Sequence, residues 1–492
     1  MFKETTQSCD LVIFGTKGDL SRRKLLPALY KLEKFKKIHP NTRIIGAARA
    51  NWNKEEYKKI VKKSIKEFLN ENFNENIWKQ LSVRLHFINI DVNEELCFIE
   101  LKKILDQTKN INIYYCAVPP NNFNAIFKGL GKINLNILPS RIIIEKPIGT
   151  CFYTCEKINN QMSKYFLESQ IFRIDHYLGK ESILNILSLR FSNSLFFHNW
   201  NYKIIDHVQI TVSEEVGIEG RWNYFNQIGQ TRDMVQNHLL QILTIIAMDP
   251  PKNIQPKSIQ NEKIKILKNL KTIDINNINT KTVRGQYTSG NINGRKIPSY
   301  LEENNTNKTS ETETFVSIKV EIENKKWHGV PFYLRTGKRL AHKYSEIVIF
   351  FKKTPVNLFS KYNKNLPLNK LILQLEPNEN IKIDLLKKLP GLYEIYQLED
   401  NRIKSNYFNK NNENKIDAYE RLLLESMKGV QSLFVSREEI ETAWKWIDPI
   451  INAWKITKKN TLQLYKPGTS GPKISDQMLI QDGRYWNKFD LN

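Results

Sequence analysis

The sequence predicts a parallel α/β sheet in its first third, followed by a larger α+β domain with a mostly antiparallel sheet and helices. Two patterns lead to this fold class. Short apolar runs alternate with helical spacings near the N-terminus, whereas strand follows strand in the second half. With 492 residues, 40% of them apolar, the chain can bury a sizeable core and form two or more domains. We expect a first domain over residues 1–177 and a second over 178–492.

The first third contains buried-type strands separated by helical patterns. The predicted strands are residues 11–14, 43–47, 84–90, 112–117 and 141–145, and the predicted helices are 23–34 and 94–105. Runs such as Leu-Val-Ile-Phe suit strands that are covered on both faces, so a parallel sheet between helices follows.

The second half contains longer strands with alternating apolar and polar residues. They are residues 207–212, 314–322, 331–335, 345–351 and 371–375. Helical patterns cover 232–248, 418–430 and 438–454, and the polar tracts 302–311 and 406–414 predict exposed loops.

Composition excludes several classes of protein. No apolar run approaches the roughly 18 residues that a membrane helix needs, and no signal-peptide stretch precedes Asp10. The five cysteines are few and scattered: Cys9, Cys97, Cys116, Cys151 and Cys155. They fit structural thiols in a reducing compartment, so we expect a cytoplasmic protein. Because no apolar run is long enough for a membrane helix, we expect no membrane partner. We also expect no metal site.

The net charge of +24 favours anionic partners such as nucleic acid or phosphorylated metabolites. The sign of the charge does not choose between them. Lysine is spread along the whole chain rather than gathered in one basic arm, so we expect no nucleic-acid partner.

A glycine turn, GTKGDL at residues 15–20, follows the first predicted strand and opens the first helix. At this position a glycine lets the backbone approach a pyrophosphate at a helix N-terminus, as in a Rossmann-type sheet. The pattern is shorter than the full GxGxxG motif, and an ordinary tight turn is the alternative.

Arg49 follows the second predicted strand, where an NAD enzyme usually carries an acidic residue. An arginine there favours the 2′-phosphate of NADP. Lys17 adds a second positive charge within the glycine turn. The alternative for Arg49 is an exposed, solubilising side chain.

The segment RIDHYLGKE at residues 173–181 concentrates cations, a phenol and acids. His176 and Lys180 are four residues apart, so on a helix they share a face and can hold a phosphate together, with Tyr177 as a hydroxyl donor. Lys146, in Glu-Lys-Pro at a strand's carboxyl end, stands where ligands bind in open α/β sheets. The alternative for residues 173–181 is a solvated polar face, and the alternative for Lys146 is a surface lysine at a strand end.

His238 falls beside the apolar stripe of the helical pattern 232–248. An imidazole with a pKa near 6.5 can accept a proton at neutral pH if a carboxylate orients it, so His238 is a candidate general base. The alternative is a buried structural histidine.

Taken together, these motifs resemble glucose 6-phosphate dehydrogenases over nearly the whole chain. RIDHYLGKE is the most specific of them. The others are GTKGDLSRRK (15–24), AVPP (117–120), EKPIG (145–149), GIEGRWNYFNQIGQTRDMVQNHLLQ (217–241), PFYLRTGKRL (331–340) and QLEPNE (374–379). The resemblance implies a domain that binds NADP and a second domain for substrate binding and oligomerisation, in a homodimer or homotetramer.

The resemblance also implies roles for individual residues in oxidising glucose 6-phosphate, the first step of the pentose phosphate pathway. His238 is the base and Asp175 orients its ring. The implied substrate contacts are Lys146, His176, Tyr177, Lys180, Glu214, Asp233, Lys338 and Lys343, with Lys24 beneath Lys146. The implied cofactor contacts are Gly15, Thr16, Lys17, Gly18, Asp19, Leu20, Arg49, Pro119, Pro120 and Lys146.

Two positions depart from the family pattern, and two other classes of protein compete with this interpretation. Glu376 stands where many members have glutamine, and Glu215 where proline is common. One competitor is an oxidoreductase of similar architecture that acts on unphosphorylated sugars; uncharged sugar would leave the cations near residue 176 uncompensated. The other is a basic nucleic-acid-binding protein, in which His238 has no role.

Overall fold

The computed structural model describes residues 7–292, 294–303, 309–363, 366–393, 396–406, 416–457 and 462–490. The chain divides into two compact units, each assembled from separate segments. The first unit comprises residues 1–181, 251–261 and 416–441, and the second comprises 182–250, 262–415 and 442–492. The domain boundary between residues 177 and 178 remains a prediction, because compactness does not show which segments fold independently.

In the described part of the first unit, seven strands form one sheet in the order β17-β6-β5-β4-β1-β2-β3. Their bounds are β1 Cys9–Phe14, β2 Arg43–Ala48, β3 Leu85–Asn89, β4 Ile111–Cys116, β5 Arg141–Ile144, β6 Ile171–Ile174 and β17 Phe434–Val435. All neighbours pair in parallel except β17 with β6. Strand order reverses between β1 and β4, which is where open α/β sheets bind ligands.

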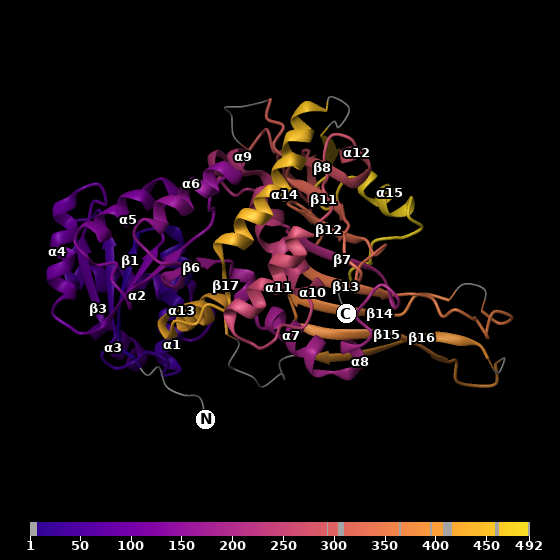
Figure 1. Ribbon diagram of the computed structural model, residues 1–492, viewed down its shortest axis with the longest axis horizontal. Coiled ribbons are helices and arrows are strands. Elements are labelled where there is room, and N and C mark those ends of the chain that lie inside the picture. The colour runs from indigo at the N-terminus through magenta and orange to yellow at the C-terminus, as the bar shows by residue number, and fades with distance from the viewer. Residues whose placement is uncertain are drawn as a thin grey trace. The chain divides into compact units, whose positions relative to one another are not determined.

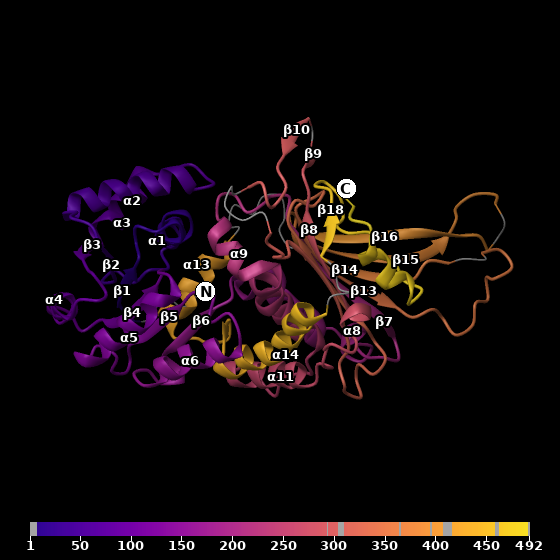
Figure 2. The same ribbon diagram turned by 90° about the horizontal axis from the view of Figure 1, so that it is seen from above.

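Helices cover both faces of this sheet (Figures 1 and 2). They are η1 Ser21–Leu25, α1 Leu26–Lys34, α2 Lys54–Phe68, α3 Glu75–Val83, α4 Glu95–Leu105, η2 Pro120–Asn122, α5 Phe123–Lys132, α6 Phe152–Ser163, η3 Glu168–Gln170, η4 His176–Gly179 and α13 Ala418–Lys428. One core cluster joins alternate residues of β1, such as Leu11 and Ile13, to side chains of α1, α2, α3 and α13. The C-terminal helix α13 therefore completes the core of the N-terminal sheet (Figure 1).

In the described part of the second unit, nine strands form a mixed sheet in the order β16-β15-β14-β13-β7-β12-β11-β8-β18. Their bounds are β7 Ile205–Ser213, β8 Thr282–Tyr287, β11 Phe315–Val320, β12 Phe332–Gly337, β13 Tyr344–Phe351, β14 Lys370–Glu376, β15 Asn380–Lys388, β16 Leu398–Asn406 and β18 Gln463–Tyr465. A hairpin pairs β9 Gly290–Ile292 with β10 Arg295–Ile297. Only the pairs β12–β7 and β18–β8 of the large sheet are parallel.

The helices of the second unit are α8 Ser194–Phe197, α9 Trp222–Gln230, η5 Thr231–Leu239, α10 Leu240–Ala247, α12 Ile278–Lys281 and α15 Ile474–Ile480. The division between the units falls within α11 Pro256–Lys268 and α14 Arg437–Ile456, and just inside the start of α7 Glu181–Ser192. Among the described residues, no helix is both long and apolar enough to cross a membrane.

The predicted fold class is confirmed: a parallel-rich sheet is followed by a larger, mostly antiparallel one. Each strand and helix expected from the sequence has a counterpart, usually within two residues at each end. Parts of the two predicted loops, residues 304–308 and 407–414, lie outside the described residues.

Candidate active site

The carboxyl edge of the first sheet collects most of the residues predicted for the first unit. Because β1, β2, β4, β5 and β6 are parallel, the segments that follow them meet at this edge. Those segments begin with the glycine turn after β1 and end with Asp175 after β6. Arg49, Pro119 with Pro120, and Lys146 follow the strands between them.

The glycine turn has a conformation that only glycine accommodates at Gly15. Its φ is +84°, and a Cβ there would lie 2.2 Å from the carbonyl oxygen of Ala117. The Gly15 N–H donates to the Ala47 carbonyl at 2.9 Å, and the Gly18 N–H donates to the Gly15 carbonyl at 2.9 Å. The turn thus folds tightly against β2 and the end of β4 just before the first helix, the position at which a dinucleotide's pyrophosphate binds in such sheets.

Helix α2 supports this turn. The hydroxyl of Thr16 and the phenol of Tyr57 are 2.8 Å apart and buried. A Cβ at Gly46 would meet the Tyr57 ring at 2.4 Å, so the glycine in β2 makes room for that ring. Beyond the turn, Asp19 accepts a hydrogen bond from Arg23 at 2.6 Å, and Leu20 directly precedes η1.

Two cations stand near the predicted adenosine end. The Arg49 side chain is 76% exposed, and its guanidinium lies 3.7 Å from Asp91. Lys17 lies 6.0 Å from the ring centre of Trp52. The Asn93 N–H and Arg49 hold the pKa of Asp91 below its ordinary value. An exposed guanidinium held at one side by a carboxylate is free to meet a phosphate at its other side.

The segment after β6 makes one tight 3₁₀ turn rather than an α-helix. Asp175 caps it by accepting the Tyr177 N–H at 2.9 Å. Lys180 has an extended backbone, so it does not share a helix face with His176 as the spacing suggested. Instead its ammonium lies 3.8 Å above the ring of buried Tyr177. The turn still places a phenol, an imidazole and an ammonium together.

Two further residues of the first unit contact predicted ones, and the sequence analysis missed them. Asp417 lies 3.3 Å from the Lys24 ammonium, and the ring of Tyr419 stacks on His176 with 6.1 Å between centroids. Tyr115 donates to Glu145, the residue before Lys146, at 2.6 Å. Asp417 caps α13 and Tyr419 lies in its first turn, more than 230 residues after His176 in the chain, so no local motif links them to the site.

In the second unit, three predicted residues lie together at the ends of the central strands β7, β12 and β13 of the nine-stranded sheet. Ser213, the last residue of β7, lies between Gly337 of β12 and Tyr344 of β13. Glu214, Lys338 and Lys343 stand next to these three positions. The side chain of Lys338 is 2% exposed, and its ammonium lies 2.8 Å from the Glu214 carboxylate.

The unusual Glu215 has a structural partner beside these strand ends. Its carboxylate accepts the backbone N–H of Lys343 at 3.1 Å. Glu215 therefore fixes the backbone that carries Lys343, which accounts for an acid where a proline is common.

Asp233 and His238 lie on η5, a π-helical segment, and His238 is completely buried. Lys24 lies on η1, the other π-helical segment of the described chain. Single π-turns within helices are rare and occur frequently at functional sites. Both segments carry residues that the sequence analysis selected.

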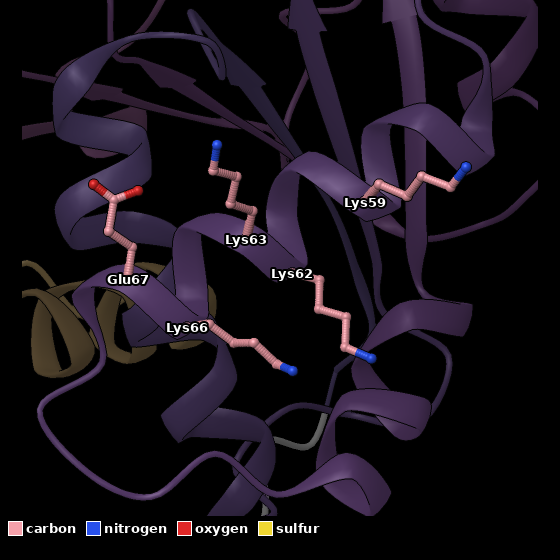
Figure 3. A pocket seen from close by; sticks show the side chains of 5 residues that line it. All are labelled: Lys59, Lys62, Lys63, Lys66 and Glu67. Atoms are coloured by element: carbon pink, nitrogen blue, oxygen red, sulfur yellow. The ribbon is translucent and has the colours of Figure 1, made fainter.

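Three cavities of the described chain lie away from these residues. One of about 650 Å³ is lined by Lys59, Lys62, Lys63, Lys66 and Glu67 on α2 (Figure 3). Two others, of about 890 and 510 Å³, adjoin the C-terminal residues from 482 onward in the second unit. Lys62 is neutralised by Glu75 at 2.8 Å, which weakens the α2 face as an anion site.

Comparison with known proteins decides the family. Residues 12–185 match the family model "Glucose-6-phosphate dehydrogenase, NAD binding domain", and residues 187–487 match "Glucose-6-phosphate dehydrogenase, C-terminal domain". The chain belongs to the glucose-6-phosphate dehydrogenase family. This confirms the resemblance that the motifs indicated.

Other family members are similar over the full length. The chain is 70% identical to the glucose-6-phosphate 1-dehydrogenase of Buchnera aphidicola subsp. Schizaphis graminum, covering 100% of both chains. It is 53% identical to that of Dickeya dadantii, covering 99% of both. Among solved structures, a glucose-6-phosphate dehydrogenase in complex with its substrate glucose-6-phosphate superposes with a TM-score of 0.90 at 31% identity. That match covers 99% of this chain and 100% of the other.

Proposed function

We propose that this chain is a cytoplasmic enzyme that oxidises D-glucose 6-phosphate to 6-phospho-glucono-1,5-lactone with NADP, the first step of the oxidative pentose phosphate pathway. The observation that carries the proposal is the 3₁₀ turn at His176–Gly179, which gathers groups suited to a phosphate at the carboxyl edge of a nucleotide-type sheet. The full-length similarity to glucose-6-phosphate 1-dehydrogenases supports it.

His176, Tyr177 and Lys180 bind the phosphate in this proposal. A sugar phosphate carries about −1.5 to −2 charges at neutral pH, which an ammonium, an imidazole and a phenol compensate. An unphosphorylated sugar would bring no such charge. Glu214 and Asp233 accept hydrogen bonds from the sugar hydroxyls, and Lys338 and Lys343 add basic contacts at the edge of the second sheet.

His238 is the proposed base. It takes the proton of the carbon-1 hydroxyl at an imidazole nitrogen while the C–O bond becomes a carbonyl. When bound, the nicotinamide ring supplies the acceptor for the hydride that leaves carbon 1. Asp175 orients the imidazole and stabilises its protonated form, as a carboxylate does in a serine-protease triad. Lys146, supported by Lys24, contacts both sugar and nicotinamide.

The glycine turn and Arg49 support NADP as the cofactor. The glycine turn stands at the N-terminus of the first helix and receives the pyrophosphate there, and exposed Arg49 meets the 2′-phosphate. Thr16, Lys17, Asp19 and Leu20 complete the turn, and Pro119 with Pro120 lines the nicotinamide side.

We further propose that the chain forms a homodimer or homotetramer through the large sheet of the second unit. Strand β16 is the edge strand at one end of that sheet, next to β15 (Figure 1). Apolar side chains are exposed around this edge, among them Leu385, Tyr396 and Ile403. An open edge with exposed apolar residues suits pairing with a second copy.

The function is tested by nicotinamide reduction with purified protein, glucose 6-phosphate or glucose, and NADP or NAD. We expect turnover with the phosphorylated sugar alone, fastest with NADP. His238→Ala should lower kcat by about 10²- to 10⁴-fold, since a general base contributes roughly that factor, and should leave NADP binding unchanged by fluorescence titration.

His198→Ala is a matched control, because His198 is exposed in the second unit away from the predicted site residues in sequence. It should retain wild-type turnover. Absence of reduction with glucose 6-phosphate would refute the function, and full turnover by His238→Ala would remove His238 as the base.

A further inference from the structure

Tyr419 links two parts of the first unit that the sequence analysis treated separately. Its ring stacks on the imidazole of His176, with 6.1 Å between centroids and 12° between ring planes. Its hydroxyl lies near the carboxylate of Glu145, whose negative charge raises the pKa of the phenol. One buried side chain thus stacks on the proposed phosphate-binding turn and lies beside the residue that precedes Lys146.

The hydroxyl of Tyr419 stays protonated beside the Glu145 carboxylate. Burial raises the pKa of this phenol, and the nearby negative charges of Glu145, Asp417 and Asp175 raise it further. Tyr115 donates a hydrogen bond to the Glu145 carboxylate at 2.6 Å. Burial raises the pKa of Glu145, and the bond from Tyr115 lowers it.

Helix α13 is seated so that Tyr419 has little freedom to move. A Cβ at Gly179 would lie 2.7 Å from the Ala418 carbonyl oxygen, so the backbone of the turn and the start of α13 touch. Asp417 caps the helix and pairs with Lys24, and Arg421 hydrogen-bonds Glu181. The helix is thereby tied to the C-terminal end of the segment that carries His176 and to η1, which carries Lys24.

We infer that Tyr419 is a positioning residue of the sugar-phosphate site: its ring orients His176, and its hydroxyl lies beside Glu145, the residue before Lys146. The inference rests on the proposed function, because it takes His176 as a phosphate ligand and Lys146 as a contact of the sugar. Tyr419 itself transfers no proton and contacts no reacting atom.

Three variants separate the two contacts. Tyr419→Leu removes the ring and the hydroxyl, Tyr419→Phe removes the hydroxyl alone, and Tyr115→Phe removes the donor to Glu145 without touching the stack. Urea unfolding of each variant establishes that it is folded before kinetics are compared.

The Leu variant should raise KM for glucose 6-phosphate about two- to tenfold, since a stacked ring pair contributes about 0.5 to 1.5 kcal/mol. Its KM for NADP should stay within about twofold. Both Phe variants should keep the wild-type KM for glucose 6-phosphate, because both leave the stack on His176 in place. Equal rises in both KM values, or no rise, would overturn the inference.

A second readout does not depend on turnover. In protein labelled with ¹³C-histidine, the His176 ring signal, assigned by its loss in His176→Gln, should move in Tyr419→Leu and stay in Tyr115→Phe. Inorganic phosphate should bind the Leu variant more weakly than wild type by the same two- to tenfold factor. If the wild type fails to oxidise glucose 6-phosphate, the proposed function fails, while unchanged His176 signals and phosphate affinity would overturn the positioning role.

Discussion

Gly179 shows how a single missing side chain decides what can lie beside a site. The α13 backbone passes so close that a Cβ at Gly179 would meet the Ala418 carbonyl oxygen and Leu422. Gly15 has the same role at the nucleotide turn, because a Cβ there would meet the Ala117 carbonyl oxygen. In both places the glycine is needed for close contact with the backbone of a distant segment.

Glu420 is the buried acid of α13 with the clearest consequence for stability. Its carboxylate lies 3.1 Å from the Lys31 ammonium and accepts the Asp417 N–H. Burial raises the pKa of Glu420 from 4.5 to about 7, and Lys31 opposes that rise. Between these two values the folded protein binds more protons than the unfolded chain, so this group's contribution to stability falls as pH rises through the window.

We predict that the free energy of unfolding of the wild type, relative to Glu420→Gln, decreases from pH 5 to pH 8. Urea unfolding followed by tryptophan fluorescence at both pH values measures it. Lys31→Met removes the compensating cation and should move the decrease to higher pH. An equal difference between wild type and Glu420→Gln at pH 5 and pH 8 would contradict the prediction.

At the scale of elements, α2 is the helix that holds the nucleotide turn. Asn53 accepts the N–H groups of Glu55 and Glu56, and the Glu56 carboxylate accepts the Asn53 N–H, which completes a capping box. The helix then carries Tyr57 to Thr16 and Gly46. Its start is therefore defined by local chemistry and its position by one buried phenol.

We predict that Asn53→Ala lowers the free energy of unfolding by about 1 kcal/mol, because the cap satisfies two otherwise unbonded N–H groups. Urea unfolding measures the change. Asn76→Ala, an exposed position inside α3, is the matched control and should change stability by less than about 0.5 kcal/mol. Equal decreases in the free energy of unfolding of the two variants would show that the Asn53 cap does not stabilise the protein more than an ordinary exposed position does.

At the scale of the whole molecule, both compact units draw on the C-terminal part of the chain. Residues 416–441 complete the first unit, and residues 442–492 belong to the second. Copies of the chain are expected to meet at the β16 edge, which makes the quaternary structure a property of the second unit.

We predict that Ile403→Lys converts the proposed oligomer into a smaller species in sedimentation velocity, because Ile403 is 52% exposed on the edge strand β16 and a charge there opposes pairing. Leu464→Lys, 67% exposed on β18 at the opposite edge of the same sheet, should sediment like the wild type. A monomeric wild type, or equal dissociation by both variants, would refute this interface.

The sequence by itself determined the kinds of element, the fold class and the family. Buried strand runs, helical spacing and contiguous motifs such as RIDHYLGKE depend on residues that are neighbours in the chain. They can therefore be recognised without a structure. The same local logic located the glycine turn and placed Arg49, Lys146 and His238 on their elements.

Only the tertiary structure decided which distant segments meet. The spacing of His176 and Lys180 suggested a shared helix face, but the chain forms a 3₁₀ turn with Lys180 over Tyr177. The contact of Lys24 with Asp417 joins residues 393 positions apart, and Tyr419 reaches His176 and Glu145 from the same helix. Such contacts depend on packing across the whole first unit. A pattern of adjacent residues does not indicate which distant segment will pack against it.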